Sequence, residues 1–319
     1  MDSSLLDEYN VKLISSVPLS AYTTFQLGGF CRGIFHCQHP DQLQKVILSL
    51  ARQKENFILI GGGSNIVVSD EGVDCYVIRY ASDITIVQRE ADDLIVSGST
   101  NLDALVQIAA DYGLEGLNYA SGIPGTVGGA IVGNAGAFGQ QVGDVLQSAL
   151  LIARDTEVKE VNAAALHFSY RHSILKETGD IVVSVRFRLK PGEKDRLWQQ
   201  REDILKLRRT KHPDLSIYPC AGSFFRNVEP TSNAGQRQAA GWFLDQAGGK
   251  QLRCGGASIF PKHANIIIKG EKCKAQDVYE LSQQMFDRVK DKFNLELIRE
   301  VRFMGKFKGM PSDGTNYIW

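Results

Sequence analysis

Apolar positions along the chain follow two different spacings, and each spacing predicts a different kind of element. Apolar residues three or four positions apart predict helices over 101–112 and 275–293. Short alternating or unbroken apolar runs predict strands over 57–60 and 180–189. The same criteria predict further strands at 31–37, 66–68, 76–79, 84–87, 94–98, 149–153, 157–161, 266–269 and 297–303, and further helices within 1–20, from Pro40, and over 194–211 and 239–247.

A glycine-rich stretch from Leu117 to Gly143 interrupts these patterns. It is apolar rather than linker-like, since Leu, Ile, Val, Ala and Phe stand between its glycines, whereas flexible linkers are polar. Glycine adopts positive φ angles and lets a ligand approach the backbone closely. The stretch therefore predicts main-chain amides wrapped around a flat or phosphate-bearing ligand, with a tightly packed structural turn cluster as the alternative.

A second cluster, from Gly61 to Asn65, reads Gly-Gly-Gly-Ser-Asn and joins two predicted strands. Consecutive amides without bulky side chains, together with a hydroxyl and an amide group, form a set of donors suited to a pyrophosphate. No helix is predicted after the cluster, so it is not the dinucleotide fingerprint, and it lacks the lysine of a Walker A loop. A bare hairpin turn, which would need fewer glycines, is the alternative.

Composition and charge narrow the range of functions. The chain has 36 Lys and Arg residues and 36 Asp and Glu residues, so no net charge favours nucleic acid or an anionic membrane. No apolar run approaches the roughly 20 residues of a membrane helix. The acidic start from Met1 to Glu8 lacks the basic and apolar segments of a signal peptide. We therefore expect a cytoplasmic protein without nucleic-acid or membrane partners.

The six cysteines are scattered along the chain and include no Cys-x-x-Cys pair. Cys31 and Cys37 have His36 and His39 nearby, but this spacing fits no common structural zinc site. The alternation over 34–37 indicates a strand instead. We expect reduced, mostly buried thiols and no metal.

Taken together, the motifs resemble those of the UDP-N-acetylenolpyruvoylglucosamine reductases, flavoenzymes of bacterial wall-precursor synthesis. Five signatures stand in the order of that family across residues 22–305. Each alone is weak, but five in order make a specific match. The signatures are Gly61 to Asn65, Ser121 to Gly139, Tyr170-Arg171, Gly222-Ser223-Phe224-Phe225-Arg226-Asn227 and Glu300-Val301-Arg302.

The resemblance implies an α+β protein with the FAD-binding fold of the vanillyl-alcohol-oxidase (PCMH) type. In that fold two α+β subdomains hold FAD between them, and a C-terminal α+β domain carries the substrate. The sequence favours a domain boundary over 191–193, where Pro-Gly ends a predicted strand. The implied parts are an N-terminal extension (1–21), two FAD-binding subdomains (22–80 and 81–192), a substrate-binding domain (193–305) and a tail (306–319).

The resemblance also implies FAD as cofactor and NADPH as co-substrate. No histidine or cysteine lies inside either glycine loop, where covalent flavin attachment would place one, so we expect noncovalent FAD. The implied cofactor-binding residues are Gly61, Gly62, Gly63, Ser64 and Asn65 in the first loop, and Ser121, Gly122, Ile123, Gly125, Thr126, Gly128 and Gly129 in the second.

The implied reaction reduces an enolpyruvyl ether on a UDP-sugar to a lactyl ether. Hydride arrives at C3, and the charge that develops at C2 and the carboxylate needs a cation and a proton donor. Matching positions assign Arg171 as the cation, Ser223 as the proton donor to C2, and Glu300 as the partner of Arg171. From the residues alone, Arg171 also fits a surface arginine, Ser223 a local turn and Glu300 a solvent-facing strand residue.

Four further residues match substrate-binding positions of the family: Tyr170, Lys211, Asn227 and His263. Lys211 follows clustered arginines and also fits a solvated helix end. The family usually has proline after the asparagine of the serine motif, whereas Val228 stands here. The short segment after the Tyr-Arg motif indicates the subgroup without an extra substrate-covering loop, which leaves open what closes over the substrate. We expect a monomer.

Two other functions stay open at this point. A different FAD-dependent oxidoreductase of the same fold would explain both glycine loops, but not Arg171, Ser223 and Glu300 together. A nucleotide-binding module without catalysis would keep the motifs for architecture alone. The absorption spectrum of the purified protein separates such a module from a flavoenzyme.

Overall fold

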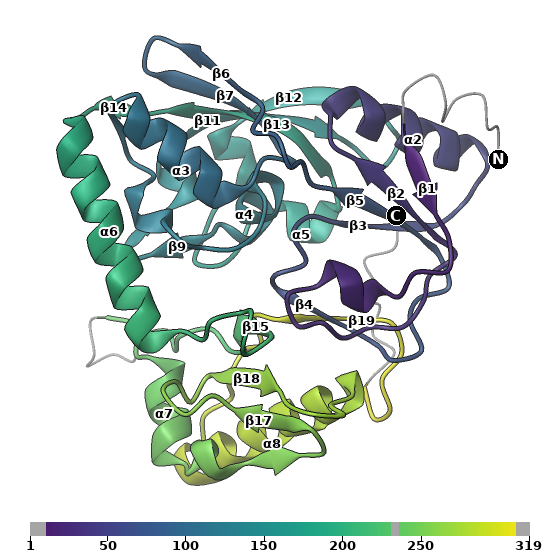
Figure 1. Ribbon diagram of the computed structural model, residues 1–319, viewed down its shortest axis with the longest axis vertical. Coiled ribbons are helices and arrows are strands. Elements are labelled where there is room, and N and C mark those ends of the chain that lie inside the picture. Colours follow the sequence, from purple (N-terminus) through teal and green to yellow (C-terminus); the bar gives the residue numbers. More distant parts are fainter. Residues whose placement is uncertain (1–10, 231–235, 311–319) are drawn as a thin grey trace.

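Three units make up the chain, and they meet around a common centre (Figure 1). The computed structural model describes residues 11–230 and 236–310. The sequence predicts a helix within residues 1–20, and over the described part this prediction is wrong, because Lys12–Ile14 forms strand β1. This strand pairs antiparallel with the strand that follows it, so its main-chain groups are satisfied in a sheet rather than a helix. The rest of that prediction, and the tail beyond 310, lie outside the described residues.

The first unit is a four-stranded sheet in the order β1-β2-β5-β3, in which β2, β5 and β3 run parallel. Helix α2 (Pro40–Arg52) covers it with the apolar face that predicts the helix. Proline at its first position and the side chain of Gln42, which accepts the His39 N–H at 3.1 Å, fix its start. The other strands are β2 (Gly33–Cys37), β3 (Phe57–Ile60) and β5 (Tyr76–Tyr80).

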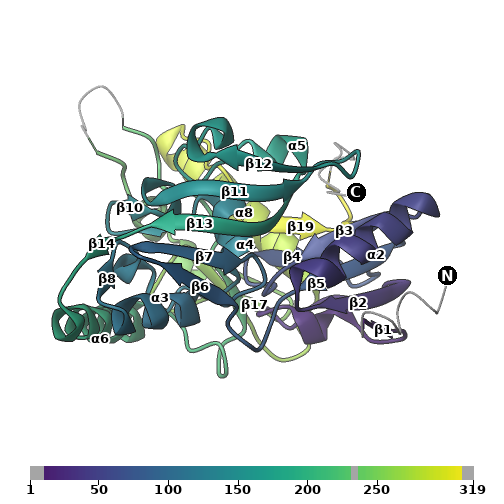
Figure 2. The ribbon, with the colours of Figure 1, turned by 90° about the horizontal axis from the view of Figure 1, so that it is seen from above.

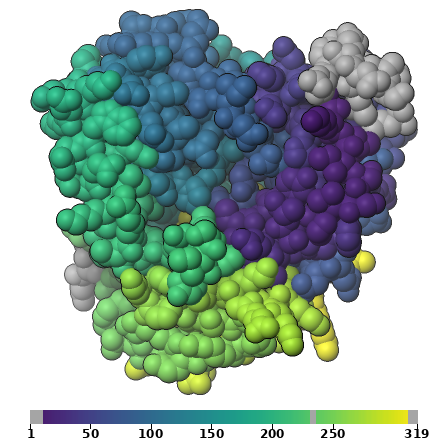
Figure 3. Space-filling view, in the orientation of Figure 1, coloured from purple at the N-terminus to yellow at the C-terminus, as the bar shows by residue number. Residues whose placement is uncertain are grey.

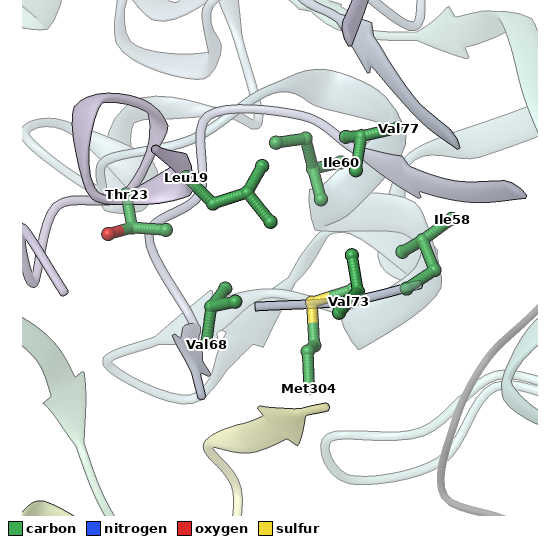
Figure 4. Close-up of a pocket in the computed structure, with 8 residues that line it drawn as sticks. All are labelled: Leu19, Thr23, Ile58, Ile60, Val68, Val73, Val77 and Met304. Carbon is green, nitrogen blue, oxygen red and sulfur yellow. The ribbon is translucent and has the colours of Figure 1, made fainter. Parts of the chain in front are cut away.

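A small void of about 10 Å³ lies inside this unit (Figure 4). It holds one water molecule at most, and its walls are apolar except for Thr23, whose hydroxyl donates to the carbonyl of Leu27 at 3.1 Å. A cofactor or sugar nucleotide does not fit there, so the functional site lies elsewhere. The lining residues are Leu19, Thr23, Ile58, Ile60, Val68, Val73, Val77 and Met304.

The second unit is an antiparallel five-stranded sheet in the order β12-β11-β13-β7-β6, whose strands lie side by side in Figure 2. Helices α3 (Leu102–Asp111) and α4 (Val127–Gly133) share one hydrophobic core with this sheet. Asn101 caps α3 by accepting the Ala104 N–H at 3.0 Å. The strands are β6 (Val87–Glu90), β7 (Asp93–Ser97), β11 (Leu146–Ile152), β12 (Val158–Asn162) and β13 (Ile181–Arg188).

The third unit is a four-stranded sheet, β15-β18-β17-β16, that packs against α7 (Ala240–Gln246) and α8 (Ala275–Phe293). The buried face of α8 is the apolar stripe that predicts the helix from sequence. Phe25 and Val67, from the N-terminal part of the chain, belong to the same core. The strands are β15 (Cys220–Ser223), β16 (Arg253–Cys254), β17 (Ala257–Ile259) and β18 (Ile266–Lys269).

Two elements connect the units. Helix α6 (Lys194–Lys211) runs from the second unit towards the third and packs on α3, while strand β19 (Arg302–Met304) pairs in parallel with β4 (Ile66–Val68) of the first unit (Figure 1). Both elements lie inside the substrate-binding domain predicted over 193–305, although each contacts another unit. The predicted domain boundaries stay predictions. In Figure 3 the surfaces of the three units meet in the middle of the face shown.

The glycine-rich stretch predicted as a loop contains helix α4, which is a correction to the sequence prediction. Glycine has a low helix propensity, so the run from Val127 to Gly133 does not read as a helix by composition. The signals lie at its ends. Thr126 caps the start by accepting the Gly129 N–H, and Asn134 ends the helix in the left-handed conformation.

Two predicted strands are also misplaced. The strand predicted over 84–87 begins only at Val87, because the hydroxyl of Ser82 accepts the Ile84 N–H and holds that segment in a turn. The strand predicted over 297–303 begins only at Arg302, because the preceding residues cross beside the serine motif. The remaining short elements are η1 (Leu19–Tyr22), β8 (Leu114–Glu115), η2 (Asn118–Ala120), β9 (Gly136–Ala137), β10 (Gln140–Gln141), η3 (Val142–Asp144), η4 (Ala163–Leu166), α5 (Leu175–Thr178), β14 (Lys190–Pro191) and η5 (Gly249–Gln251).

Within the described residues no helix is long and apolar enough to cross a membrane. Across the same residues, no group of three or more His, Cys, Asp or Glu side chains is arranged to hold a metal ion. All six cysteines are free thiols.

Candidate functional site

The two glycine loops, one from each of the first two units, lie against one another. The hydroxyl of Ser64 donates to the carbonyl of Pro124 at 2.9 Å. A β-carbon on Gly62 would lie 2.9 Å from the α-carbon of Gly125, and one on Gly61 would overlap the hydroxyl of Thr126. Only glycine lets the two backbones approach this closely, which explains the glycine density that the sequence shows.

The main-chain amides of the first loop are unused. None of the five N–H groups from Gly61 to Asn65 donates to another atom of the described residues. Gly63 has a φ of +63°, and a β-carbon there would overlap the carbonyl oxygen of Tyr22. Unpaired main-chain donors are rare in folded proteins and are normally satisfied by water or a ligand. The loop is therefore a preformed set of donors for an anionic group.

The second loop uses most of its amides internally. The N–H of Ser121 donates to Asn118 O, that of Ile123 to Ala120 O at 2.9 Å, and that of Gly128 to Gly98 O at 2.9 Å. The Gly129 N–H donates to the cap Thr126. Among the second-loop residues predicted to bind cofactor, only Gly125 and Thr126 keep main-chain amides without an acceptor in the described parts of the chain.

Asp103 of α3 holds this loop in place, and the sequence prediction missed it. One carboxylate oxygen accepts the Gly122 N–H at 2.6 Å, and the two oxygens receive a bidentate pair from Arg201 of α6 at 2.5 and 2.7 Å. Burial opposes ionisation of Asp103, but the bonds from Arg201 and Gly122 outweigh it and keep its pKa below the ordinary value. Gly122, predicted to bind cofactor, therefore donates its amide to the carboxylate of a partly buried ion pair and does not offer it to a ligand.

Arg171 and Glu300, predicted as catalytic partners, are in contact. The Arg171 Nε atom lies 3.0 Å from Oε1 of Glu300, and both side chains are about one-fifth exposed, at 23% and 20%. Arg171 has a φ of +58°, a left-handed conformation that costs a residue with a β-carbon about 1–2 kcal/mol. It occupies the third position of a four-residue turn closed by Ser169 and His172, where glycine is usual. Strain of this kind at a non-glycine residue is typical of functional sites.

Ser223 is connected to the Arg171–Glu300 pair through the main chain of its neighbour, Phe224. It is the last residue of β15 and follows Gly222, whose φ is +74°. The carbonyl of the next residue, Phe224, accepts the Glu300 N–H at 2.8 Å. No acceptor among the described residues takes the hydroxyl proton of Ser223, so this proton is free to be given away.

Glu300 is the point at which the first glycine loop also joins the site. The side-chain amide of Asn65 donates to the carbonyl of Glu300 at 3.2 Å, and the Arg302 N–H donates to the carbonyl of Asn65 at 3.1 Å. The parallel pairing of β4 with β19 continues from these bonds. The unpaired amides of the first loop and the Arg171–Glu300 pair are thus fixed relative to one another.

Lys176 stands among three arginines and the Glu300 carboxylate, and most of these cations escaped the sequence prediction. Burial, and then the charges of Arg302, Arg226 and Arg171, lower the pKa of Lys176 to about 8, while Glu300 opposes the shift. Around Lys176, four cations including Lys176 itself accompany a single carboxylate, and this excess of positive charge suits an anionic ligand. Arg226 and Arg302 belong to the signature motifs, so their positions were visible in the sequence, but Lys176 gave no signal.

Tyr170 and Asn227, both predicted to bind substrate, are brought together. The Tyr170 hydroxyl accepts the Asn227 N–H at 3.3 Å. The Tyr170 ring faces two guanidinium groups, with the Arg237 carbon 4.1 Å and the Arg171 carbon 5.3 Å from its centre. Tyr170 therefore connects the serine motif to the strained turn that carries Arg171.

Lys211 and His263 form a second pair of predicted substrate residues. Lys211 ends α6 with an exposed side chain, and the ring of the following residue, His212, lies 5.7 Å from that of His263. Burial lowers the pKa of His263, and burial together with Arg208 lowers that of His212 to about 4, so both rings are neutral at pH 7. Neither Lys211 nor His263 is joined to Tyr170 or Asn227 by a hydrogen bond or ring contact within the described parts of the chain.

Arg208 is another residue that the sequence prediction left out. It lies on the inward side of α6 against Gly122, where an added β-carbon would be 3.2 Å from its Cδ. Its buried Nε atom has no hydrogen-bond partner among the described residues, as expected of a donor that a ligand would satisfy.

Comparisons with known proteins agree with this arrangement. Residues 31–162 match the model of the FAD binding domain, and residues 212–304 match that of the UDP-N-acetylenolpyruvoylglucosamine reductase C-terminal domain. The first match covers the two glycine loops, and the second covers Ser223, Asn227 and Glu300. The unpaired amides and the close-packed glycines fit FAD, which needs donors for its pyrophosphate and a close approach for its ring.

Relatives match over nearly the whole chain. UDP-N-acetylenolpyruvoylglucosamine reductase 1 of Bacillus thuringiensis subsp. konkukian is 34% identical over 94% of this chain and 98% of its own length. The reductase of Lactobacillus delbrueckii subsp. bulgaricus is also 34% identical, with the same coverage. The crystal structure of the Thermus caldophilus enzyme is 31% identical, has a TM-score of 0.74, and covers 92% of this chain and 98% of that one. The chain therefore belongs to the UDP-N-acetylenolpyruvoylglucosamine reductase family.

Proposed function

We propose that this chain is the FAD-containing enzyme that reduces the enolpyruvyl ether of UDP-N-acetylglucosamine to its lactyl ether, UDP-N-acetylmuramate, with NADPH as reductant. The observation that carries the proposal is the 3.0 Å pair between Arg171 and Glu300. The main chain of Glu300 is bonded both to the side chain of Asn65 in the first glycine loop and to the carbonyl of Phe224 in the serine motif. A flavin oxidoreductase acting on another substrate class has no need of a guanidinium, a carboxylate and a serine at this junction.

Arg171 supplies the cation that the reaction needs. When bound, FAD supplies hydride transfer between NADPH and C3 of the enolpyruvyl group. Negative charge then develops at C2 and on the adjoining carboxylate of the substrate. The Arg171 guanidinium stabilises this charge, and Glu300 keeps the guanidinium oriented before substrate arrives, so little reorganisation is needed during the reaction.

Ser223 gives its hydroxyl proton to C2 in the last step. A serine hydroxyl is a weak acid, so the transfer requires that the proton is not committed elsewhere and that cations lie nearby. Its proton has no acceptor among the described residues, and Arg226, three residues on, belongs to the cations around Lys176. The serine then regains a proton from solvent.

Binding of the UDP-sugar is assigned to Tyr170, Lys211, Asn227 and His263 as part of the same proposal. The contact of Tyr170 with Arg171 and the bond from the Asn227 N–H to Tyr170 support a role for both near the reacting group. Lys211 carries an exposed charge suited to a diphosphate, and His263 lies close to the end of the same helix. We further infer noncovalent FAD, a monomer and a cytoplasmic location, which acid precipitation, gel filtration and cell fractionation test.

The two half-reactions test the function directly. The bound flavin is reduced anaerobically with NADPH, the enolpyruvyl UDP-sugar is added, and reoxidation is followed by absorbance. We expect the Ser223→Ala protein to be reduced at the normal rate and reoxidised about 10²–10⁴-fold more slowly, because only the proton transfer is lost. Ser216→Ala, a change at an exposed serine, is the matched control.

The outcomes separate the alternatives. A wild-type protein whose reduced flavin is not reoxidised by this substrate would be a different flavin oxidoreductase. A protein that stays colourless after addition of FAD would be a nucleotide-binding module without catalysis. Equal losses in both half-reactions of Ser223→Ala would mean that Ser223 shapes the site instead of delivering a proton.

A further inference from the structure

Arg171 stands in a backbone conformation that its own residue type does not favour. Its φ of +58° lies at a turn position where glycine or asparagine is usual. The hydrogen bonds between Ser169 and His172 close the turn, but they leave the Arg171 carbonyl without a partner inside it. Any protein partner of this carbonyl therefore lies outside the turn.

That partner is Lys176. Its ammonium donates to the Arg171 carbonyl at 2.6 Å, and no carboxylate lies within ion-pair distance of it among the described residues. The segment that carries it is itself anchored, since the hydroxyl of Ser173 donates to Val132 O at 2.8 Å and the Ile174 N–H donates to Leu166 O at 2.9 Å. A charge-assisted bond from a fixed segment is a strong constraint on the Arg171 peptide group.

We propose that Lys176 is a positioning residue: its ammonium group holds the main chain of Arg171 in the left-handed conformation that directs the guanidinium at Glu300. The inference rests on the proposed function, because it concerns the residue that stabilises charge on the substrate. Lys176 lies outside the five signature motifs, so the inference adds a residue to the site that these motifs do not include.

The charges around Lys176 make this arrangement sensitive to pH. Arg171 faces it from the turn, Arg226 from the segment after β15, and Glu300 and Arg302 from the segment around β19, while α4, which packs on α5, carries no charged side chain. The pKa of Lys176, lowered to about 8 by burial and these cations, means that the ammonium is present at pH 7 and lost at moderately alkaline pH. The bond to Arg171 then weakens to that of a neutral amine.

The lowered pKa of Lys176 also determines whether its charge raises or lowers the free energy of unfolding. The unfolded chain keeps the lysine proton up to its ordinary pKa of 10.5, whereas the folded chain releases it near 8. Between these values the unfolded state binds more protons, so stability rises with pH, and charged Lys176 lowers stability at pH 7. A group that only supported the fold would not lower stability in its charged form.

Three proteins test the proposal: wild type, Lys176→Met, which keeps the length of the side chain without the charge, and Lys176→Arg, which keeps the charge at all accessible pH values. Reoxidation of the reduced flavin by the enolpyruvyl UDP-sugar is measured from pH 6 to 9.5. We expect wild type to lose rate with an apparent pKa near 8, Lys176→Met to be roughly 10- to 100-fold slower without this transition, and Lys176→Arg to stay fast without it. Lys159→Met, at a partly exposed lysine of β12 that pairs with Asp180, should keep the wild-type rate and the alkaline transition.

Reduction by NADPH and thermal unfolding complete the test. The Lys176→Met protein should be reduced normally, and its unfolding midpoint at pH 7 should stay within about 3 °C of wild type or rise. An alkaline transition unchanged in Lys176→Met, or a fall in stability that accounts for its lost rate, overturns the proposal.

A crystal structure of Lys176→Met tests the role of Lys176 independently of the substrate. We expect Arg171 to leave the left-handed region or to lose its 3.0 Å contact with Glu300, and Lys176→Arg to keep both. A variant that keeps both despite the methionine refutes the role of Lys176, whatever the wild-type flavin does with the enolpyruvyl UDP-sugar. Failure of wild-type reoxidation alone refutes the proposed function.

Discussion

The two glycine loops look alike in sequence and lie against one another, yet they use their main-chain amides in opposite ways. The loop from Gly61 to Asn65 leaves five amides without an acceptor among the described residues. In the loop from Ser121 to Gly129, most main-chain amides donate to main-chain carbonyls, to the partly buried carboxylate of Asp103 or to the Thr126 side chain that caps α4. The first loop offers free N–H donors to a ligand. The second loop is held in shape by its own hydrogen bonds, and we call it the wall loop. Glycine content alone therefore does not distinguish a loop that binds an anion from a loop that shapes a surface.

The largest effect is expected where the donor loop is most constrained. Gly63→Val should abolish retention of FAD, because the residue has a φ of +63° and its β-carbon would overlap the Tyr22 carbonyl. The flavin absorbance of the purified protein measures this. Gly133→Ala is the matched control in α4, since nothing lies within 4 Å of its β-carbon, and it should keep FAD. Full flavin content in both variants would remove the distinction between the two loops.

A smaller effect is expected when the loop from Ser121 to Gly129 loses its bond to Asp103. Asp103→Asn breaks the bidentate pair with buried Arg201 and should lower the free energy of unfolding by roughly 3 kcal/mol at pH 7, as urea titration would show. The pKa of Asp103 is lowered in the folded chain, so its stabilising contribution is present above the ordinary aspartate pKa and is lost as pH falls through the folded value.

The difference between wild type and Asp103→Asn should therefore shrink at pH 3. The matched control is Asp111→Asn on the same helix, where an exposed pair with Lys194 is lost and little change is expected. Equal losses of unfolding free energy in the two variants at pH 7 would mean that the loop from Ser121 to Gly129 does not depend on the Asp103–Arg201 pair.

The smallest effect is expected at the contact between the loops. Ser64→Ala removes one hydrogen bond, from the Ser64 hydroxyl to the Pro124 carbonyl, which is worth about 1 kcal/mol. The FAD dissociation constant should rise about fivefold, and fluorescence titration of the apoprotein measures it. Ser49→Ala, on α2 away from both loops, should leave the constant unchanged. A hundredfold loss in Ser64→Ala would show that the hydroxyl binds FAD itself.

Secondary structure was predictable where one spacing ran for several turns. The bounds of α6 and α8 agree with the sequence prediction because charge or an apolar stripe continues without interruption over each. Helix α4 was missed because its composition argues against a helix, although its caps, Thr126 and Asn134, give the opposite signal. The strand over 297–303 was misplaced because its first residues pair with the serine motif, a contact between distant segments that local spacing does not encode.

The residues of the site also fall into a group that the sequence predicted and a group that it did not. Motif order brought Arg171, Ser223 and Glu300 into consideration, and the structure joins Arg171 to Glu300 directly and Ser223 to them through one main-chain bond. Asp103, Arg208 and Lys176 could not be found from their neighbours in sequence, because each resembles an ordinary polar position of a helix. Their importance comes from what packs against them, which only the folded chain reveals. The assigned roles remain predictions that the experiments above address.

The parallel pairing of β19 with β4 also sets an order of events during synthesis. Arg171 and Ser223 leave the ribosome well before Glu300. Strand β19 must then pair with β4, which was synthesised more than two hundred residues earlier. A nascent chain that has folded its first two units would present the guanidinium without its carboxylate. The paired site thus forms only after the last strand has been made, so an incomplete chain lacks the Arg171–Glu300 pair.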